Sequence, residues 1–224
     1  MPYRNVLLAQ DQVYHIFNRG VAAIPIFHSF KYYSRFLALV DFYRFSNTQA
    51  SFSKVMKLPY DEKRDILNRL RKENKTHVEI LAFCLMPNHF HFLLKQITEK
   101  GVSIFLSNLQ NGYAKYLNIK NERVGPLFQS MFKAVRITTD EQLTHVSRYI
   151  HLNPSTGYLV EPKNLLEYEW SSLGSYLKEG KTYPFVTPDI VLSLFKNAIS
   201  YKQFVLDQAD YQRELDRVKH LTLE

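Results

Sequence analysis

Short hydrophobic segments, bounded by polar residues, glycine or proline, recur along the chain. This pattern is typical of β-strands. It predicts four strands, at Gln12–Asn18, His77–Met86, His89–Ile97 and Phe132–Ile137. Only Pro87 and Asn88 separate the second and third of these segments, so we expect the two to form an antiparallel hairpin.

Other segments repeat hydrophobic residues every three or four positions, which indicates amphipathic helices. Such helices are predicted at Phe30–Phe45 and Ser103–Asn118. A third helix is expected to begin at Thr138, because the series from Thr138 to Glu141 fits a capping box. It is expected to end at Pro154, since proline disfavours helical backbone in the residue before it.

Three regions fall outside this regular pattern. Residues 47–75 form a polar insertion that contains a charged helix, Asp61–Lys72. The basic side of that helix could contact phosphates or could simply be solvated. One or two short helices are predicted within residues 162–180, and the chain after about Pro188 is expected to be helical.

The order of these elements predicts the fold class. Strand, helix, strand, strand, helix, strand, helix is the order of a split β-α-β unit. We therefore expect an α+β, ferredoxin-like sandwich with an antiparallel sheet, helices on one face, and a helical C-terminal extension. The chain length of 224 residues favours one main domain, at residues 1–180 with the insertion at about 47–75, followed by a tail at residues 181–224.

Composition indicates a polyanionic partner. The formal net charge is +8 and the isoelectric point is about 9.4, and basic surfaces bind nucleic acids by neutralising phosphates. The 15 tyrosines and 16 phenylalanines favour single strands, because aromatic rings stack on unpaired bases. Most of these rings are nevertheless expected to lie in the core.

Other features bear on the location of the protein. No apolar run approaches the roughly 18 residues of a membrane span, and the first ten residues lack the layout of a signal peptide. The single cysteine, Cys84, excludes an intrachain disulfide framework. We expect a cytoplasmic protein that makes no membrane contact.

The first candidate chemical group is the pair His89 and His91. Alternate residues of a strand share a face, so both imidazoles point the same way, while Phe90 and Phe92 point toward a core. Such a pair could ligate one divalent ion, or it could be an ordinary exposed or hydrogen-bonded pair. Mg²⁺ or Mn²⁺ would leave positions open for phosphate oxygens, and Zn²⁺ could also bind.

The second candidate group is Tyr149, on the capped helix. Its helical neighbours one turn away are His145 and Asn153, and it lies beside the apolar stripe rather than opposite it. A side chain at that position can reach a site between the helix and the sheet. Read from the helix pattern alone, Tyr149 could equally be one of many tyrosines that pack the protein.

Several motifs, taken in order and spacing, resemble those of a known family, and this resemblance favours the catalytic interpretation of both groups. The chain resembles the IS200-like tyrosine transposases, most closely the REP-associated group within the HUH (His-hydrophobe-His) endonuclease superfamily, over about residues 12–178. The motifs that carry the resemblance are YHIFNRG at 14–20, MPNHFHFLL at 86–94, YAKYLN at 113–118, GPLFQ at 125–129, RYIHLNP at 148–154 and YEWSS at 168–172.

The resemblance implies a function for particular residues. His89 and His91 would be metal ligands, with Mg²⁺ or Mn²⁺ as the ion, and Asn153 would be a third ligand or a helper. Tyr149 would be the nucleophile, forming a covalent 5′-phosphotyrosine on single-stranded DNA near a hairpin-forming palindrome. Basic residues that could contact phosphates are Arg19, Arg123, Lys133 and Arg136.

Some points differ from the family or stay open. Ser130-Met131 stands where many relatives have a small residue followed by arginine, so Lys133 could take over that phosphate contact. Tyr113 and Tyr116 form a rival pair of nucleophiles. A non-catalytic nucleic-acid-binding protein with the same fold is the alternative function, and a zinc hydrolase lacks its usual motif. The family implies either a monomer or a homodimer.

Overall fold

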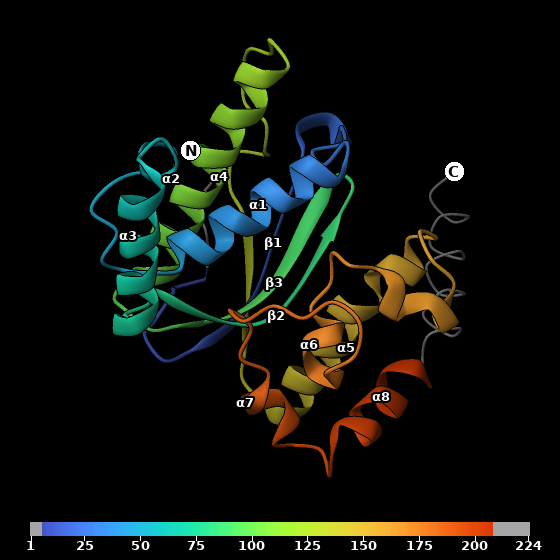
Figure 1. Cartoon of the computed structure of the whole chain (residues 1–224). Helices are drawn as coiled ribbons and strands as arrows, with labels where there is room; N and C mark the ends of the chain where they lie inside the picture. The colour runs from blue at the N-terminus through green and yellow to red at the C-terminus, as the bar shows by residue number, and fades with distance from the viewer. Residues whose placement is uncertain (1–5, 208–224) are drawn as a thin grey trace.

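The computed structural model describes residues 6–207. Its centre is a four-stranded antiparallel sheet in the order β2-β3-β1-β4. The strands are β1 (Val13–Arg19), β2 (Val78–Met86), β3 (His89–Gln96) and β4 (Lys133–Ile137). The predicted α+β fold with an antiparallel sheet is confirmed (Figure 1).

The β2–β3 hairpin forms as the sequence predicts. Met86 pairs with His89 across the turn, and Pro87 and Asn88 make the connection. The turn is anchored to β1, because the backbone N–H of Gly20 donates to the carbonyl of Asn88 at 2.8 Å. This pairing places the start of β3 beside the end of β1.

One face of the sheet is covered by α1 (Phe30–Tyr43) and α4 (Gly101–Lys120). The rings of Phe90 and Phe92 on β3 pack against Phe36 of α1, with centroid separations of 5.4 Å and 6.4 Å. Both β3 phenylalanines are fully buried, which confirms that they point into a core. Burying rings of this size is a main source of stability for such a layer.

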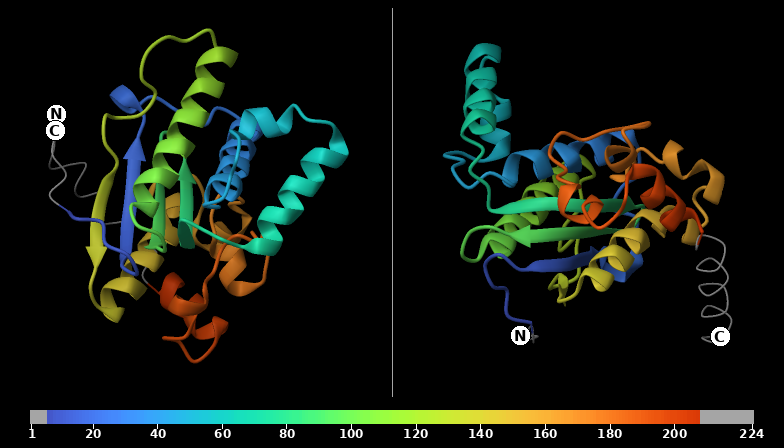
Figure 2. Two further views of the ribbon diagram at one scale, coloured as in Figure 1. Left: turned by 90° about the vertical axis from the view of Figure 1, so that its left-hand side faces the viewer. Right: turned by 90° about the horizontal axis from the view of Figure 1, so that it is seen from below.

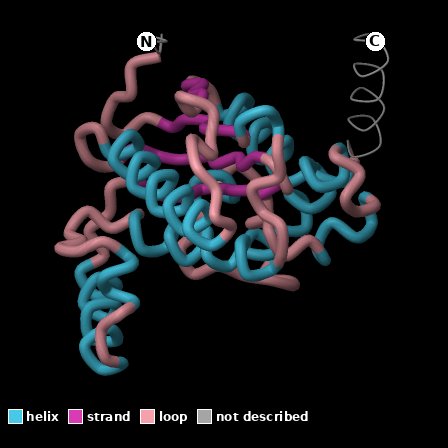
Figure 3. The backbone as a smooth tube through the Cα atoms, turned by 90° about the horizontal axis from the view of Figure 1, so that it is seen from above, coloured by secondary structure: helices cyan, strands magenta, loops and turns pink. Residues whose placement is uncertain are grey.

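The opposite face is covered by α5 (Asp140–Thr156), so the expectation of helices on one face only is wrong. Figure 1 shows α1 and α4 above the strands and α5 to α8 below them. The views from below (Figure 2) and above (Figure 3) show the same two helical layers. The cause lies in β2, whose continuous apolar run is buried at nearly every position. A strand of that composition needs cover on both faces.

The N-terminus of α5 differs from the predicted capping box by one residue. Thr139, not Thr138, is the N-cap, and its hydroxyl accepts from the backbone N–H of Gln142 at 3.1 Å. Gln142 in turn accepts from the backbone N–H of Thr138 at 2.9 Å. Both threonines satisfy the sequence rule, and the one with a glutamine three residues later forms the cap.

The C-terminal end of α5 also differs from the prediction. Pro154 lies within the helix, which continues to Thr156. Proline costs one backbone donor and crowds the preceding turn, yet the chain keeps its helical course here for two further residues. Asn153 therefore sits inside the last turns of α5 rather than at its end.

The insertion at residues 47–75 folds as two helices, α2 (Phe52–Met56) and α3 (Tyr60–Glu73). They stand off from the sheet in both views of Figure 2. Leu70 is the buried residue of α3, whereas the charged residues of α3 remain largely in solvent. Its charged surface is thus mostly solvated.

The 3₁₀ helix Pro162–Glu167 and the helices α7 (Asp189–Leu192) and α8 (Ala198–Leu206) contact α5. The helix α6 (Leu173–Leu177) contacts α8, and a second 3₁₀ helix, Val21–Ala23, follows β1. Within the described part of the predicted tail, residues 189–192 and 198–206 are helical and the rest is turn or irregular; residues 208–224 lie outside the described residues. The domain boundary at about residue 180 stays a prediction. Within residues 6–207, no helix is long and apolar enough to cross a membrane.

Candidate active site on the α5 face of the sheet

Two histidines of β3 face α5 side by side. Their ring centroids are 5.0 Å apart. His91 is buried and His89 half-buried. The alternation along β3 that sends Phe90 and Phe92 to the opposite face brings these two imidazoles together, as the sequence predicts.

A hydrogen bond fixes the protonation of His89. Its Nδ1 lies 2.6 Å from Oδ1 of Asn88, and the amide of Asn88 is oriented by donating from Nδ2 to the carbonyl of Ala23 at 3.1 Å. Since Oδ1 can only accept, Nδ1 of His89 must carry the proton. The other ring nitrogen, Nε2, then has a free lone pair.

His91 has a comparable arrangement with a different partner. Its Nδ1 lies 3.0 Å from Nε2 of His15 on β1. The Nε2 atom of His91 is buried and makes no hydrogen bond to any described residue. If Nδ1 of His91 donates to His15, the buried Nε2 presents a lone pair, which is the state that a metal ion requires.

Burial keeps these imidazoles neutral. It lowers the pKa of His89 and of His15 to about 4 and lowers the pKa of His91 well below its ordinary value. The positive charge of Arg19 lowers the pKa of His89 further. Neutral rings at physiological pH are ready to act as ligands without first losing a proton.

Tyr149 lies over these histidines. Its ring meets His91 edge-on with centroids 5.5 Å apart and meets His15 in the same way at 5.8 Å. The side chain is 41% exposed, so a substrate can reach it from solvent. The helix therefore holds a phenol and the sheet holds two imidazoles against the same small volume.

Asn153 joins the two sides of this site. Its Nδ2 donates to the backbone carbonyl of Tyr149 at 2.8 Å. A hydrogen bond between its side chain and His89 partly offsets the effect of burial on the pKa of that histidine. The side chain of Asn153 thus contacts both the backbone of α5 and His89.

The donor set fits a divalent ion that has few protein ligands. Among residues 6–207, no group of three His, Cys, Asp or Glu side chains could hold a metal. His15 cannot complete such a set, because its Nε2 is engaged by His91. The orphaned Nε2 of His91, the Nε2 of His89 and the amide oxygen of Asn153 fit an ion that keeps open positions for substrate oxygens.

Comparison with known proteins finds a matching family model. Residues 54–153 match the family model described as "Transposase IS200 like". Over this segment the chain is similar to the IS200-like transposases. The segment contains β2, β3, α4, β4 and most of α5, and it therefore includes both histidines and Tyr149.

A solved structure has the same fold. It is described as "Structure of the REP associates tyrosine transposase bound to a REP hairpin". The match has a TM-score of 0.55 and 15% sequence identity, and it covers 84% of this chain and 91% of that chain. At this identity the likeness shows a shared fold. No curated protein matches the sequence significantly.

Two of the four predicted phosphate-binding residues lie at the candidate active site. Arg19 pairs with His89 across β1 and β3, so its side chain is on the histidine face. Lys133 pairs with Phe17 on the same face, and its Nζ lies 5.8 Å from that ring. Both side chains are exposed, and either could receive a phosphate.

The other two predicted phosphate-binding residues are placed differently. Arg123 donates to the carbonyl of Pro126 at 2.7 Å and to Asn118 Oδ1 at 3.0 Å, so it holds the loop that leads to β4. Arg136 pairs with Tyr14 on the opposite face of the sheet and donates to Gln12 at 2.7 Å. The structure does not bring these two cations to the histidines.

The rival tyrosines lie away from the site. The hydroxyl of Tyr113 is buried on the α4 face and donates to the carbonyl of Ile26 at 2.5 Å. Burial raises the pKa of Tyr113 above its ordinary value, which disfavours the phenolate. Tyr116 lines a groove between α1, α2 and α4.

His15 and Asn88 belong to the site and were missed as functional residues. Both lie within motifs that carry the family resemblance. The signal for His15 is the alternation His15, Phe17, Arg19, which puts a histidine, a ring and a cation on one face of β1. The register between β1 and β3 cannot be read from the sequence, and this register places His15 against His91.

Proposed function

We propose that this protein is a metal-dependent single-stranded DNA endonuclease and transposase. It cleaves and rejoins DNA near hairpin-forming palindromes through a covalent 5′-phosphotyrosine. The observation that carries this proposal is the position of the Tyr149 ring, 5.5 Å from the ring of His91, whose buried Nε2 has no hydrogen-bond partner among the described residues.

In the proposed reaction, the oxygen of Tyr149 forms a bond to the phosphorus of a DNA phosphodiester. The bond from phosphorus to the 3′ oxygen breaks, and that oxygen leaves as a 3′ hydroxyl after taking up a proton, while the tyrosine loses its own. The phosphotyrosine preserves one phosphodiester bond, so the attack of a 3′ hydroxyl in the reverse direction rejoins strands without ATP.

Each neighbouring side chain has a role in this step. His89, His91 and Asn153 would hold a Mg²⁺ or Mn²⁺ ion, which when bound supplies Lewis-acid polarisation of the scissile phosphate. Asn88 and His15 orient the two imidazoles through their Nδ1 atoms. Arg19 and Lys133, which are exposed on this face, would receive flanking phosphates.

The site components come from one chain, so we propose that a single copy carries a complete active site. Tyr149 lies on α5 of the same subunit whose β3 holds His89 and His91. A monomer is then sufficient for cleavage, although two copies could still cooperate in strand transfer. Helix exchange between subunits is not required to bring the phenol to the histidines.

The experiment that tests the proposal is covalent trapping. The protein is mixed with Mn²⁺ and a hairpin oligonucleotide that carries a single-stranded flank and a 3′ label, and the products are separated on a denaturing gel. We expect a labelled protein band for the wild type and none for Tyr149→Phe. Tyr158→Phe and Tyr113→Phe are matched controls that should retain the band.

Two outcomes would contradict the proposal. If Tyr149→Phe forms the adduct and Tyr113→Phe does not, the nucleophile is assigned wrongly. If wild-type protein binds the hairpin tightly but forms no adduct with Mg²⁺, Mn²⁺ or Zn²⁺, the protein is instead a non-catalytic nucleic-acid-binding relative.

A further inference from the structure

A groove of about 660 Å³ lies between α1, α2 and α4. α1 and α4 cover the face of the sheet that carries Phe90 and Phe92, whereas α5, which carries Tyr149, lies on the other face (Figure 1). The groove is therefore separate from the candidate active site. One of its walls, α2, comes from the insertion at residues 47–75.

The lining of the groove is strongly basic. The described lining residues include five basic side chains and no aspartate or glutamate, and the five are Arg35, Lys54, Lys57, Lys115 and Lys120. The four lysines are exposed, so their ammonium groups can turn toward a ligand. Like charges gathered without an acidic partner repel one another, and an anion relieves this repulsion.

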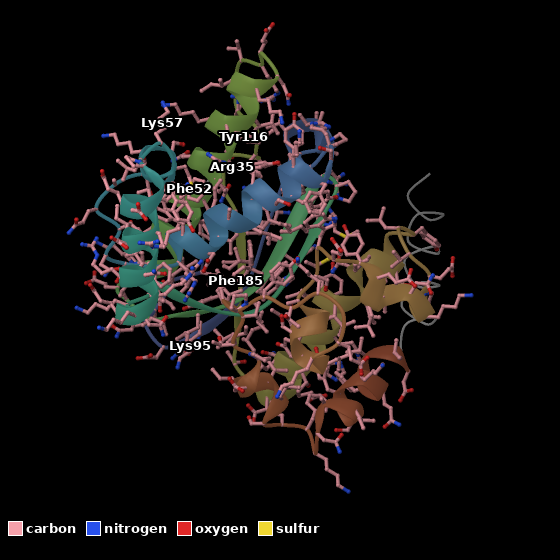
Figure 4. All side chains as sticks on the ribbon, in the orientation of Figure 1. Arg35, Phe52, Lys57, Lys95, Tyr116 and Phe185 are labelled. Atoms are coloured by element: carbon pink, nitrogen blue, oxygen red, sulfur yellow. The ribbon has the colours of Figure 1, made fainter. Side chains whose placement is uncertain are left out.

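Arg35 is held in a fixed position at the floor of the groove. Its guanidinium carbon lies 4.4 Å from the ring centroid of Phe52 and 4.8 Å from that of Tyr116. Figure 4 shows these three side chains converging from α1, α2 and α4, with Lys57 nearby. A guanidinium sandwiched between two rings loses little freedom when it binds a phosphate.

The hydrogen bonds of Arg35 leave capacity for a ligand. Its Nε is buried and has no partner among the described residues. Its contact with Ser53 Oγ is long, at 3.4 Å. A buried arginine donor without an acceptor is costly, and a bound anion is the simplest acceptor for a site of this charge.

On the α4 wall of the groove, two asparagines and a lysine supply hydrogen-bond donors at helical spacing. Asn108, Asn111 and Lys115 follow one another at intervals of three and four residues, so their side chains form one row along the groove. Side-chain amides and ammonium groups in a row suit a chain of phosphates better than one isolated ion.

We infer that this groove binds the phosphodiester backbone of nucleic acid at a second site, distinct from the one that holds Tyr149. The inference rests on the proposed function only in taking DNA as the ligand. The bound segment is the duplex stem of a hairpin or a neighbouring duplex. The helix α2, which belongs to the insertion at residues 47–75, supplies one wall of the groove.

The test compares two triple variants that remove the same charge. Lys54→Gln/Lys57→Gln/Lys115→Gln alters the groove, and Lys72→Gln/Lys163→Gln/Lys181→Gln removes three exposed lysines elsewhere. Binding of a blunt duplex that has no single-stranded flank is measured by fluorescence anisotropy over a range of salt concentrations. Thermal unfolding checks that both variants are folded.

We expect the groove variant to bind the duplex at least roughly tenfold more weakly than the control variant at low salt. The slope of log K against log salt concentration should fall by about 2 to 3, since each lost phosphate contact lowers it by about 0.9. Equal binding by the two triple variants would overturn the inference. So would tripolyphosphate binding that is lost in the groove variant but does not compete with the duplex, since that would identify a small-anion site.

The groove variant also distinguishes a failure of this inference from a failure of the proposed function. Covalent adduct formation by the groove variant, measured at saturating hairpin, should equal that of the wild type. If wild-type protein forms no adduct and the groove variant still loses duplex binding, the proposed chemistry fails and the groove assignment stands.

Discussion

Because of the buried residue His151, we expect the free energy of unfolding of the protein to fall measurably in acid. His151 lies on α5, fully buried, with Nδ1 2.7 Å from the hydroxyl of Tyr201 and Nε2 2.8 Å from Oγ of Ser172. Tyr201 donates its proton to Ser147, and Ser147 donates to a backbone carbonyl. Nδ1 of His151 is therefore the donor to Tyr201. The hydroxyl of Ser172 lies 2.8 Å from Nε2 and 3.2 Å from the carbonyl of Phe83, and it donates to Nε2 over the shorter distance. The network satisfies a neutral ring completely.

The size of the effect follows from the pKa. Burial lowers the pKa of His151 from 6.5 to about 3. Because the folded pKa is below the unfolded one, the unfolded chain takes up the proton first as the pH falls. The contribution of His151 to stability is complete above about pH 6.5 and is lost progressively toward pH 3. At pH 5 the loss is about 2 kcal/mol, from 1.5 pH units at roughly 1.4 kcal/mol each.

The assay is urea unfolding at pH 8 and pH 5 for the wild type and His151→Gln. The other lowered histidines are present in both proteins, so the difference between the two pH dependences isolates His151. We expect the wild type to lose about 2 kcal/mol more than the variant between these pH values. An NMR titration should show His151 still neutral at pH 5. Identical pH dependence in both proteins, or an imidazole that titrates near 6.5, would refute the reasoning.

Three further predictions concern the candidate active site. His89→Ala should reduce adduct formation at least ~100-fold yet change the unfolding free energy by less than about 1 kcal/mol, since the half-buried ring is not part of the core; retained cleavage with Mn²⁺ would oppose its role as a ligand. Mixing Tyr149→Phe with His91→Ala should not restore the adduct, because each active site is built from one chain; restored activity would mean that subunits exchange α5. Arg19→Ala should weaken binding of single-stranded DNA and reduce its salt dependence by about 0.7, whereas an unchanged slope would remove Arg19 from the phosphate contacts.

Much of the sheet could be predicted from the sequence because its signals are local. The His-Phe-His alternation places two imidazoles on one face and two phenyl rings on the other, and both placements are confirmed by the packing of Phe90 and the meeting of His91 with Tyr149. The nearly unbroken apolar run of β2 also indicates burial on both faces, and therefore helices on both faces of the sheet.

The rest depends on contacts between segments that are distant in the chain. His15 becomes part of the site only through the β1–β3 register, 76 residues away from His91. Arg123 looks like a phosphate ligand in the sequence, but the loop it closes takes up its donors. Arg136 falls on the opposite face because of its position in β4. Charge alone therefore predicts a basic protein without predicting which cations surround the reaction.

The most direct test of the central claim is to locate the covalent bond. Adduct formed with Mn²⁺ and a hairpin oligonucleotide is digested with nuclease and protease, and the peptide that retains a nucleotide is sequenced by tandem mass spectrometry. The account predicts that the added mass lies on Tyr149 and is linked through a 5′ phosphate. A nucleotide found on Tyr113, Tyr116 or any serine, or one linked through a 3′ phosphate, would contradict it.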